Sequence, residues 1–278
     1  MVETQMSVKL ISHTQLSEEF YNSFDILDEF LGYEGNQHDR WGATDGQAVA
    51  LTAIRTCYSA NKPSEIVVLE GDKYFGQTAS DGEGGTEADR LFRHITRSGH
   101  TSTMEHLTFT FAIEGVSRAL LAQLTRHRVG FSYSVQSQRY VRMGSSDKTG
   151  GFDYVVPPTL NGKDTDSTRL IGFNEETGDA IWRNITAVEE FEDAMSTLQS
   201  VYDRLRRAGV PPEDARMVLP NAAATNLVMT ANLRALLDFY SKRREGRGAQ
   251  WEIAELAEQL RKEVTKAEPW TAPYFDVA

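Results

Sequence analysis

The alternation of hydrophobic and polar positions predicts a chain that mixes strands and helices. Apolar side chains fall at every second position of residues 107–113, which is the period of a half-buried strand. A shorter apolar stretch in residues 6–14 predicts a first strand. Beyond Gly115 the apolar positions take helical spacing, so we expect a helix that leads to Arg126. Helical patterns also predict helices over residues 48–59, 185–208, 213–220, 232–244 and 249–268.

Two segments lack this regular pattern. Residues 71–85 are rich in glycine, aspartate and serine and are expected to form a loop. Residues 144–179 are rich in glycine, aspartate, threonine and proline, with one strand expected at the apolar residues 154–156. Helical signal resumes directly afterwards, so we interpret 144–179 as a loop-rich excursion from one domain spanning residues 1–278. The predicted fold class is α/β (α+β), a single domain with a mainly antiparallel sheet flanked by long helices.

The composition excludes several classes of protein. At 278 residues the chain can bury a large core without disulfides or metal ions. Its single cysteine, Cys57, excludes a disulfide-stapled scaffold, and we interpret it as a core residue of a helix instead of a nucleophile. No apolar run approaches the ~20 residues of a membrane span, and residues 1–5 carry no signal-peptide core. We therefore expect a globular, cytoplasmic protein with no membrane partner.

The charge of the chain is distributed unevenly. The net charge is −11, yet the 29 basic residues comprise 21 arginines and 8 lysines. Arginine suits planar, bidentate recognition of phosphates and carboxylates. Residues 115–146 contain no aspartate or glutamate but hold Arg118, Arg126, Arg128, Arg139 and Arg142. We expect a local anion site on a protein that repels bulk polyanions, and therefore no nucleic-acid partner.

The densest polar stretch is residues 126–140, which begins with Arg126-His127-Arg128. Three potential cations in a row at a helix end repel one another unless an anion lies among them. The serine, tyrosine and glutamine residues that follow supply neutral donors, acceptors and stacking surfaces, a set that suits a nucleotide. A solvated basic loop is the alternative, and composition alone leaves both interpretations open.

Four of the six histidines lie close together in the sequence, which raises the question of a metal site. They are His94, His100, His106 and His127. The sequence contains no HExxH motif or comparable ligand spacing, and on a strand Glu105 would point away from His106. We expect no metal and interpret the histidines as hydrogen-bonding braces of the site.

A second basic cluster lies in residues 242–247, where Gly246 and Gly248 interrupt a helical pattern. A broken helix can aim backbone N–H groups and a cation at one point, which suits an anion or a polarised carbonyl. An ordinary helix end, where basic residues are favoured, is the alternative. The sequence has no nucleotide-binding glycine loop and no GxSxG motif, so the chemistry is expected to belong to a bound cofactor.

In these blocks the chain resembles the flavin-dependent thymidylate synthases, the ThyX family. The family hallmark is Arg-His-Arg, then seven or eight residues, then serine; here eight residues separate Arg128 from Ser137. The likeness continues through residues 138–140, back to residues 99–106, and on to residues 215–220, 232–234 and 249–253. Several ordered blocks therefore support the resemblance over residues 48–269.

The resemblance implies an activity and an assembly. It implies methylation of dUMP to dTMP, with 5,10-methylenetetrahydrofolate as the carbon donor, FAD as the redox carrier and NADPH as the reductant. It implies that the reaction proceeds without an enzymic nucleophile, and that the chain forms a homotetramer whose active sites are shared between subunits. A nucleotide-binding protein of the same fold without turnover is one alternative. An RNA-binding protein is another, which the net charge of −11 disfavours.

The resemblance also implies site residues by position. Flavin-binding positions are Ser102, Arg126, His127, Arg128, Asn232, Arg234 and Asp238, the last often Asn or His in the family. Positions around dUMP are Gln123, Arg126, Ser137, Gln138, Arg139, Arg216 and Arg243. The catalytic arginine that polarises the pyrimidine is Arg243 when counted forward from Asn232 and Arg244 when counted back from Ala249. We favour Arg243, because an extra residue is easier to absorb near Gly246 and Gly248 than inside a helix.

Overall fold

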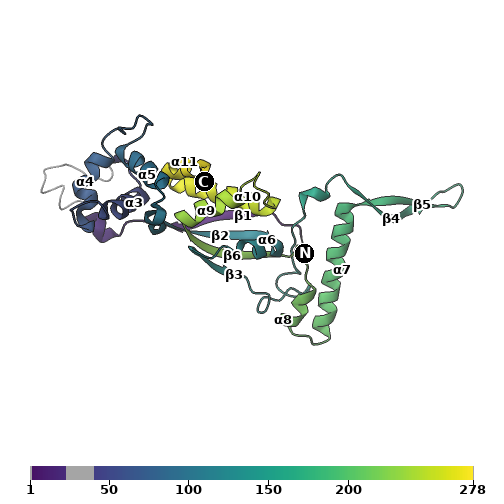
Figure 1. Cartoon of the computed structure of the whole chain (residues 1–278). Coiled ribbons are helices and arrows are strands. Elements are labelled where there is room, and N and C mark those ends of the chain that lie inside the picture. The colour runs from purple at the N-terminus through teal and green to yellow at the C-terminus, as the bar shows by residue number, and fades with distance from the viewer. Residues whose placement is uncertain (1, 23–40, 278) are drawn as a thin grey trace. The chain divides into compact units, whose positions relative to one another are not determined.

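The computed structural model describes residues 2–22 and 41–277 (Figure 1). The strands are β1 (Ser7–His13), β2 (Thr108–Ser117), β3 (Phe131–Val135), β4 (Asp164–Phe173), β5 (Ala180–Thr186) and β6 (Ala224–Asn232). The helices are α3 (Asp45–Thr56), α4 (Ile66–Tyr74), α5 (Glu87–Arg97), α6 (Arg118–Leu124), α7 (Ala187–Arg207), α8 (Pro212–Ala215), α9 (Leu233–Arg243), α10 (Trp251–Ala267) and α11 (Ala272–Val277). Short 3-10 helices cover Pro63–Glu65, Thr101–His106, Pro158–Leu160, Arg216–Val218 and Pro269–Thr271.

The strands form two sheets, and the chain divides into two compact units. One sheet has the order β1-β2-β6-β3, and the other is an antiparallel hairpin of β4 and β5. Unit 1 comprises Met1–Ser7, Ile113–Arg126 and Ser134–Leu227, and unit 2 comprises Val8–Ala112, His127–Tyr133 and Val228–Ala278. Each strand of the four-stranded sheet therefore contains residues of both units. The expected α+β class is confirmed.

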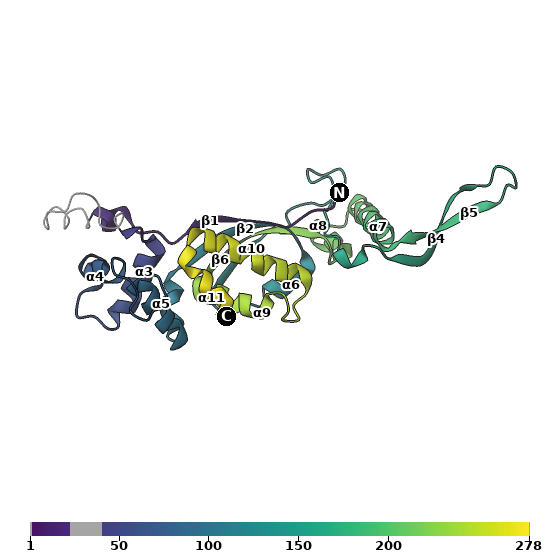
Figure 2. The same ribbon diagram turned by 90° about the horizontal axis from the view of Figure 1, so that it is seen from above.

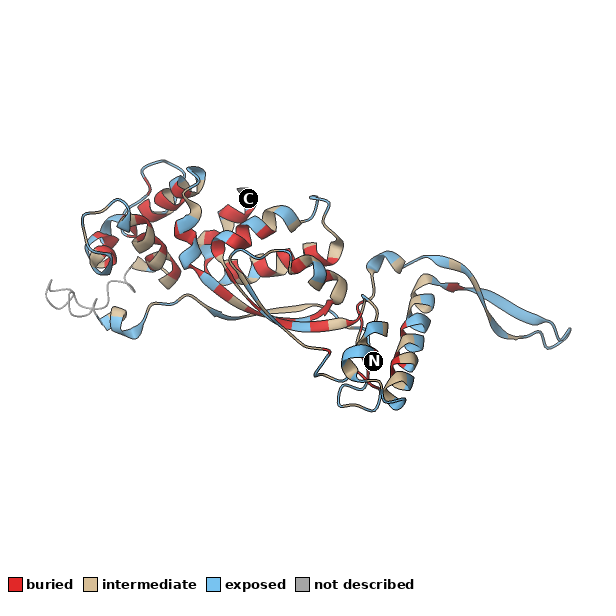
Figure 3. Ribbon diagram, turned by 60° about the horizontal axis from the view of Figure 1, so that its bottom comes forward, coloured by how far each residue is buried: buried red, intermediate tan, exposed pale blue. Residues whose placement is uncertain are grey.

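Unit 2 buries its core between strands and C-terminal helices. Alternate side chains of β2, such as Phe109 and Phe111, are buried because a strand points successive side chains to opposite faces. Helices α9, α10 and α11 lie against this part of the sheet in Figures 1 and 2. They bury apolar residues spaced three or four apart, such as Ile253 and Leu256. Figure 3 shows the buried stretches of the chain in red.

A buried carboxylate connects distant segments of unit 2. Glu268 is 1% exposed and accepts hydrogen bonds from the Thr44 hydroxyl and, at 2.7 Å, from the Trp270 indole N–H. Thr44 is also the N-cap of α3, where it forms a capping box with Gln47. The Glu268 carboxylate thus lies at the N-terminus of α3, where the partial positive charge of the helix stabilises an anion.

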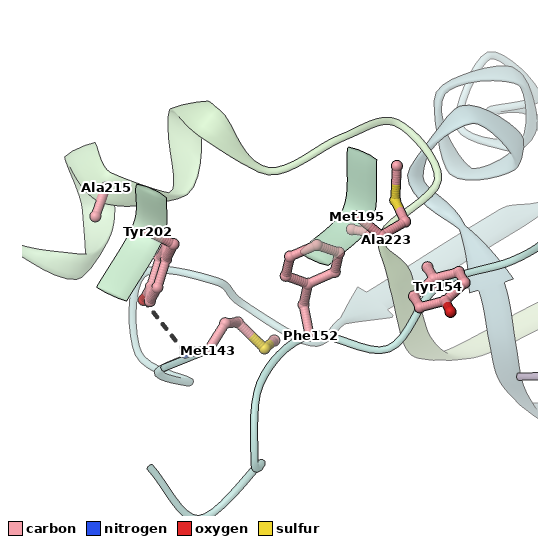
Figure 4. Close-up of a cluster of buried hydrophobic side chains, with 7 residues drawn as sticks. All are labelled: Met143, Phe152, Tyr154, Met195, Tyr202, Ala215 and Ala223. Carbon is pink, nitrogen blue, oxygen red and sulfur yellow. Dashed lines mark hydrogen bonds between the residues drawn. The ribbon is translucent and has the colours of Figure 1, made fainter. Parts of the chain in front are cut away.

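Unit 1 is organised around the long helix α7. Thr186 and Glu189 form a capping box that begins the helix, and Gly209 follows its last turn. A buried apolar cluster packs on one side of α7 (Figure 4) and comprises Met143, Phe152, Tyr154, Met195, Tyr202, Ala215 and Ala223. Inside it, the Met143 N–H donates to the Tyr202 hydroxyl at 3.2 Å, so the polar group of this buried tyrosine is satisfied.

The helices predicted from periodicity are confirmed at α3, α6, α7, α9 and α10, and the strands at β1 and β2. The segment 213–220 is only partly helical, as α8 passes into a 3-10 helix. Residues 1 and 278, the boundaries of the predicted single domain, lie outside the described residues. The assignment of one domain to residues 1–278 therefore stays a prediction.

Several local predictions are wrong. Gly71 and the three residues after it belong to α4 instead of a loop; glycine is required there because the Trp41 ring occupies the space of a β-carbon. Residues 154–156 form no strand, since Tyr154 makes only isolated bridges, and the excursion instead contains the β4–β5 hairpin.

Two side-chain interpretations are also wrong. Glu105 and His106 lie in a 3-10 helix instead of a strand, so the two-residue alternation of a strand does not separate them. Cys57 is exposed because it follows the last residue of α3, where the helix face no longer points to the core. Among the described residues, no helix is both long and apolar enough to cross a bilayer.

Gly46→Ala tests the packing at Glu268. An added β-carbon would lie 2.7 Å from Glu268 Oε2, and a shift of the buried carboxylate would disturb its hydrogen bonds with Thr44 and Trp270. We expect a loss of about 1–3 kcal/mol in the free energy of unfolding, measured by urea denaturation. Gly172→Ala is the control, because nothing lies within 4 Å of its β-carbon position. Equal unfolding midpoints for both variants would contradict this packing.

Candidate active site

The residues expected at the site are divided between the two units. Unit 1 contains most of the positions expected around the nucleotide: Gln123, Arg126, Ser137, Gln138, Arg139 and Arg216. Unit 2 contains most of those expected around the flavin, together with both candidate catalytic arginines: Ser102, His127, Arg128, Asn232, Arg234, Asp238, Arg243 and Arg244. The residues of each unit are therefore described separately.

His127 is held from several sides in unit 2. Its ring Nε2 accepts a hydrogen bond of 3.1 Å from Arg243 Nε, so the ring is neutral while this bond is formed. The edge of the ring meets Phe239 with centroids 4.9 Å apart. The Tyr133 hydroxyl donates to the His127 carbonyl at 2.7 Å, and burial raises the pKa of Tyr133, so this hydroxyl stays protonated. Both the ring and the backbone of His127 are thereby fixed.

Asn232 connects this loop to α9. Its side-chain oxygen accepts from the Ala235 N–H at 2.9 Å and caps α9, and its own N–H donates to the Gly130 carbonyl at 3.1 Å. Gly130 has a φ of +76°, and a β-carbon there would lie 2.8 Å from the Asn232 amide nitrogen. The close approach requires glycine, and it sets the loop of Arg128 against the start of α9.

The other expected flavin positions lie at the surface of unit 2. Arg234 forms an ion pair with Glu105, and both side chains are about half exposed. Asp238 pairs with Lys242 at 2.7 Å one turn further along α9. Ser102 is exposed in the 3-10 helix Thr101–His106. These groups can reach a ligand, but Arg234 and Asp238 already hold partners of opposite charge.

The two candidate catalytic arginines point to different places. Arg243, the last residue of α9, donates to His127. Arg244 is the C-cap of α9. It lines a cavity of about 710 Å³ together with Tyr240 of α9 and with Trp251 and other residues of α10. Arg243 is therefore the one of the pair that contacts the Arg-His-Arg segment.

Unit 1 contains a pair of arginines near one another. Burial, and then the charge of Arg216, lowers the pKa of the Arg118 guanidinium. Arg118 donates to the Thr225 hydroxyl at 3.4 Å and Arg216 to the Glu213 carbonyl at 3.0 Å. Neither has a carboxylate at ion-pair distance among the described residues. Two neighbouring cations with only neutral partners are a suitable site for an anion.

The remaining expected nucleotide positions differ in exposure. Arg139 pairs with Glu213 at 2.9 Å across an exposed surface, and its N–H donates to the Ser137 hydroxyl at 3.3 Å. Gln138 is 6% exposed, so its amide belongs to the interior of unit 1. Gln123 lies on the last turn of α6, and Arg126, two residues after that helix, is exposed, as is Arg128. No ion pair of Arg126 or Arg128 occurs within the ranges 2–22 and 41–277.

Residues 41–270 match the family described as "Thymidylate synthase complementing protein". The chain belongs to this family. It is 37% identical over 225 residues to the flavin-dependent thymidylate synthase of Geobacter sulfurreducens, covering 81% of this chain and 80% of that protein. It is 37% identical over 240 residues to that of Halobacterium salinarum, covering 80% and 94%. The resemblance seen in the Arg-His-Arg blocks is confirmed.

Two further comparisons mark the extent of the likeness. The flavin-dependent thymidylate synthase of Nitratidesulfovibrio vulgaris is 46% identical over 166 residues, but the match covers 60% of this chain and only 59% of that protein. A crystal structure of the UMP/dUMP methylase PolB of Streptomyces cacaoi, bound with 5-Br dUMP, superposes with a TM-score of 0.64. It covers 99% of this chain and 97% of that one, and at 20% identity it supports the fold of this thymidylate synthase family member.

Three residues that contact the expected site positions were not themselves predicted as site residues. Arg118 falls in the acid-free window of residues 115–146, and that window was the signal that could have selected it. Glu105 was weighed only as a metal ligand, whereas it is the partner of Arg234. Tyr133 was expected only as a stacking surface of the segment 126–140, whereas its hydroxyl donates to the His127 backbone carbonyl.

Two of the four histidines make contacts that fit the bracing role. His127 contacts Arg243, and His100 Nδ1 lies 3.1 Å from the Tyr58 hydroxyl. Within the described ranges, no three His, Cys, Asp or Glu side chains gather closely enough to hold a metal ion.

Proposed function

We propose that this chain is a flavin-dependent thymidylate synthase that methylates dUMP to dTMP. The one-carbon unit would come from 5,10-methylenetetrahydrofolate, with FAD as cofactor and NADPH as reductant. The observation that carries the proposal is the hydrogen bond from Arg243 to His127, because it joins the Arg-His-Arg block to the helix that Asn232 caps, between residues 116 positions apart. Family membership over residues 41–270 supports the same activity.

The residues of unit 2 fit a flavin dinucleotide. Its pyrophosphate is an anion, and Arg128 is an exposed arginine in the loop that Gly130 and Asn232 hold against α9. We assign Ser102, Arg126, His127, Arg128, Asn232 and Arg234 to the flavin, and Asp238 as a further contact. FAD, when bound, would supply the reducing equivalents of the reaction.

The residues of unit 1 fit a nucleoside monophosphate. Arg118 and Arg216 offer two guanidinium groups, neither in an ion pair with a carboxylate of the described residues, which suits a phosphate of charge near −2. We assign Gln123, Arg126, Ser137, Gln138, Arg139 and Arg216 to dUMP and add Arg118 on the basis of its geometry. The hydrogen-bonding groups of Ser137 and Gln138 would face the sugar and base.

Arg243 is assigned the catalytic role. When C5 of the uracil ring attacks the one-carbon unit, negative charge develops on the N3–O4 side of the ring. A guanidinium stabilises that charge without losing its proton, and the bond from Nε to His127 leaves both Nη groups free to donate. The enzyme would need no nucleophile of its own. We propose further that the chain is a cytoplasmic homotetramer whose active sites are shared between subunits.

The purified full-length protein tests this function directly. We expect a yellow protein with flavin absorbance in the visible blue, and dTMP formation that requires dUMP, NADPH and methylenetetrahydrofolate together. A colourless protein that cannot be reconstituted with FAD would contradict the proposal. Binding of FAD and dUMP without any dTMP would instead identify a nucleotide-binding relative that lacks turnover.

Arg243→Ala and Arg244→Ala separate the two candidate arginines. Loss of one preorganised donor typically lowers the rate by ~10²–10³-fold, and we expect a loss of this size in kcat for Arg243→Ala. Arg244→Ala should keep most of the activity, because its side chain lines a different cavity. The flavin spectrum of each variant is the control for folding. The reverse order of activities would move the catalytic role to Arg244.

Arg118→Ala tests the phosphate site of unit 1. A hydrogen bond to a charged group contributes about 1.5–3 kcal/mol, so we expect KM for dUMP to rise roughly 10- to 100-fold with a smaller change in kcat. Arg118→Lys should recover part of the affinity, since it restores the charge without the planar fork. Arg204→Ala, at an exposed arginine of α7, is the matched control. An unchanged KM for Arg118→Ala would remove this residue from the site.

A further inference from the structure

The β4–β5 hairpin is an isolated two-stranded ribbon that projects from the start of α7 (Figure 1). Its strands pair in antiparallel register, with Arg169 opposite Arg183 and Leu170 opposite Trp182. Directly opposite residues share a face of the ribbon, and the next pair along lies on the other face. A two-stranded hairpin is marginally stable in water by itself, so its two faces need partners.

One face is anchored to α7 by ion pairs. Arg183 and Arg169 would repel each other across the strands, but both contact Glu189 on the first turn of α7. Arg169 also pairs with Asp193 one turn later. The hydrogen bond from Arg183, followed by those from Thr186, lowers the pKa of Glu189 to about 2, so this acid keeps its charge at neutral pH. These contacts orient the hairpin and account for the charged face.

The opposite face is apolar and uncovered. It carries Leu170 opposite Trp182 and Phe173 opposite Ala180, flanked by the neutral pair Thr168 and Asn184. Leu170, Phe173 and Trp182 are 41%, 63% and 58% exposed, and Figure 3 shows the hairpin almost entirely in the colour of exposed residues. We call these six residues the apolar hairpin face. A charge-free face with two exposed aromatic rings is unusual on a chain of net charge −11 and marks an interaction surface.

We propose that the apolar hairpin face is a contact between two copies of this chain, packed face to face with their hairpins antiparallel. A two-fold contact uses the same patch on both sides, and this patch is self-complementary because no charge is buried when it meets itself. The hairpin tip carries three acids, Glu175, Glu176 and Asp179. Antiparallel packing points the two tips in opposite directions and so avoids their mutual repulsion.

The area of the face agrees with a contact of this kind. Since one aromatic side chain spans 150–250 Å², the exposed parts of Leu170, Phe173 and Trp182 amount to roughly 400 Å² per copy. With the flanking Thr168 and Asn184, two copies would remove about 1,000 Å² from water, near the lower size of a specific interface. This contact is separate from the shared active sites proposed above and does not depend on the chemistry.

Sedimentation velocity of the full-length protein over a range of concentrations tests the contact. Removing large side chains from the centre of an interface commonly costs 2 kcal/mol or more, so the double variant Leu170→Ser, Trp182→Ser should weaken self-association at least ~30-fold or lower the assembly state. Ile181→Ser is the control, because Ile181 is 43% exposed but lies opposite Gly172 on the other face. A monomeric parent protein, or a double variant that sediments like the parent, overturns the proposal.

Cysteine cross-linking provides a readout that does not depend on the double variant's folding. In a Cys57→Ser background, Asn184→Cys should give a covalent dimer with a bifunctional maleimide, because Asn184 lies at the edge of the apolar hairpin face and packed sheet faces lie about 10 Å apart, too far for a direct disulfide. Ile181→Cys should stay uncross-linked, and the reverse result overturns the proposal. The flavin spectrum and dTMP assay on the same samples separate the two claims: an active enzyme without this contact keeps the proposed function and rejects only the hairpin contact.

Discussion

The hydrogen bond between Arg243 and His127 is the constraint on which the geometry of unit 2 depends. It joins the end of α9 to the Arg-His-Arg loop, and it requires a neutral imidazole whose Nε2 can accept. Two neighbouring contacts hold His127 in position for this bond. The Tyr133 hydroxyl donates to the His127 backbone carbonyl, and the ring of Phe239, on α9 itself, contacts the His127 ring. These contacts hold His127 in one position beside Arg243, and the catalytic role proposed for Arg243 would require preorganisation of this kind.

Ion pairing distinguishes the arginines that stabilise the fold from those at the candidate site. Most described arginines with a structural role have a carboxylate partner, as Arg55 has in Glu70 and Arg183 in Glu189. Arg118 is different, because it is partly buried and its strongest charged neighbour is another arginine. The nearby carboxylate of Glu213 pairs with Arg139, so neither Arg118 nor Arg216 forms an ion pair among the described residues. An anion bound between them, as we propose for the phosphate of dUMP, would offset the free-energy cost of two adjacent cations.

The sequence predicted those features that depend on local periodicity or on ordered motif blocks. Helices such as α7 and α10 have long amphipathic patterns and clear stop signals, and their positions were predicted to within a few residues. The β4–β5 hairpin was missed because its apolar face is exposed, so it shows no burial pattern against a core. Arg118, Tyr133 and Glu105 act through partners that folding brings near. Spacing alone cannot identify such partners, although an acid-free window did indicate the region of Arg118.

The backbone also supports the choice of Arg243 over Arg244 as the arginine we propose to be catalytic. Inserting one residue into a helix rotates everything beyond it by about 100°, because a turn takes 3.6 residues. Helix α9 runs unbroken from Leu233 to Arg243, and its Asn232 cap fixes where it begins. The residues after it include Gly246 and Gly248, with φ values of +81° and +73°, which a loop can use to absorb an extra residue without moving either helix. Counting forward from the cap therefore preserves the face of α9 that meets His127, and that face ends in Arg243.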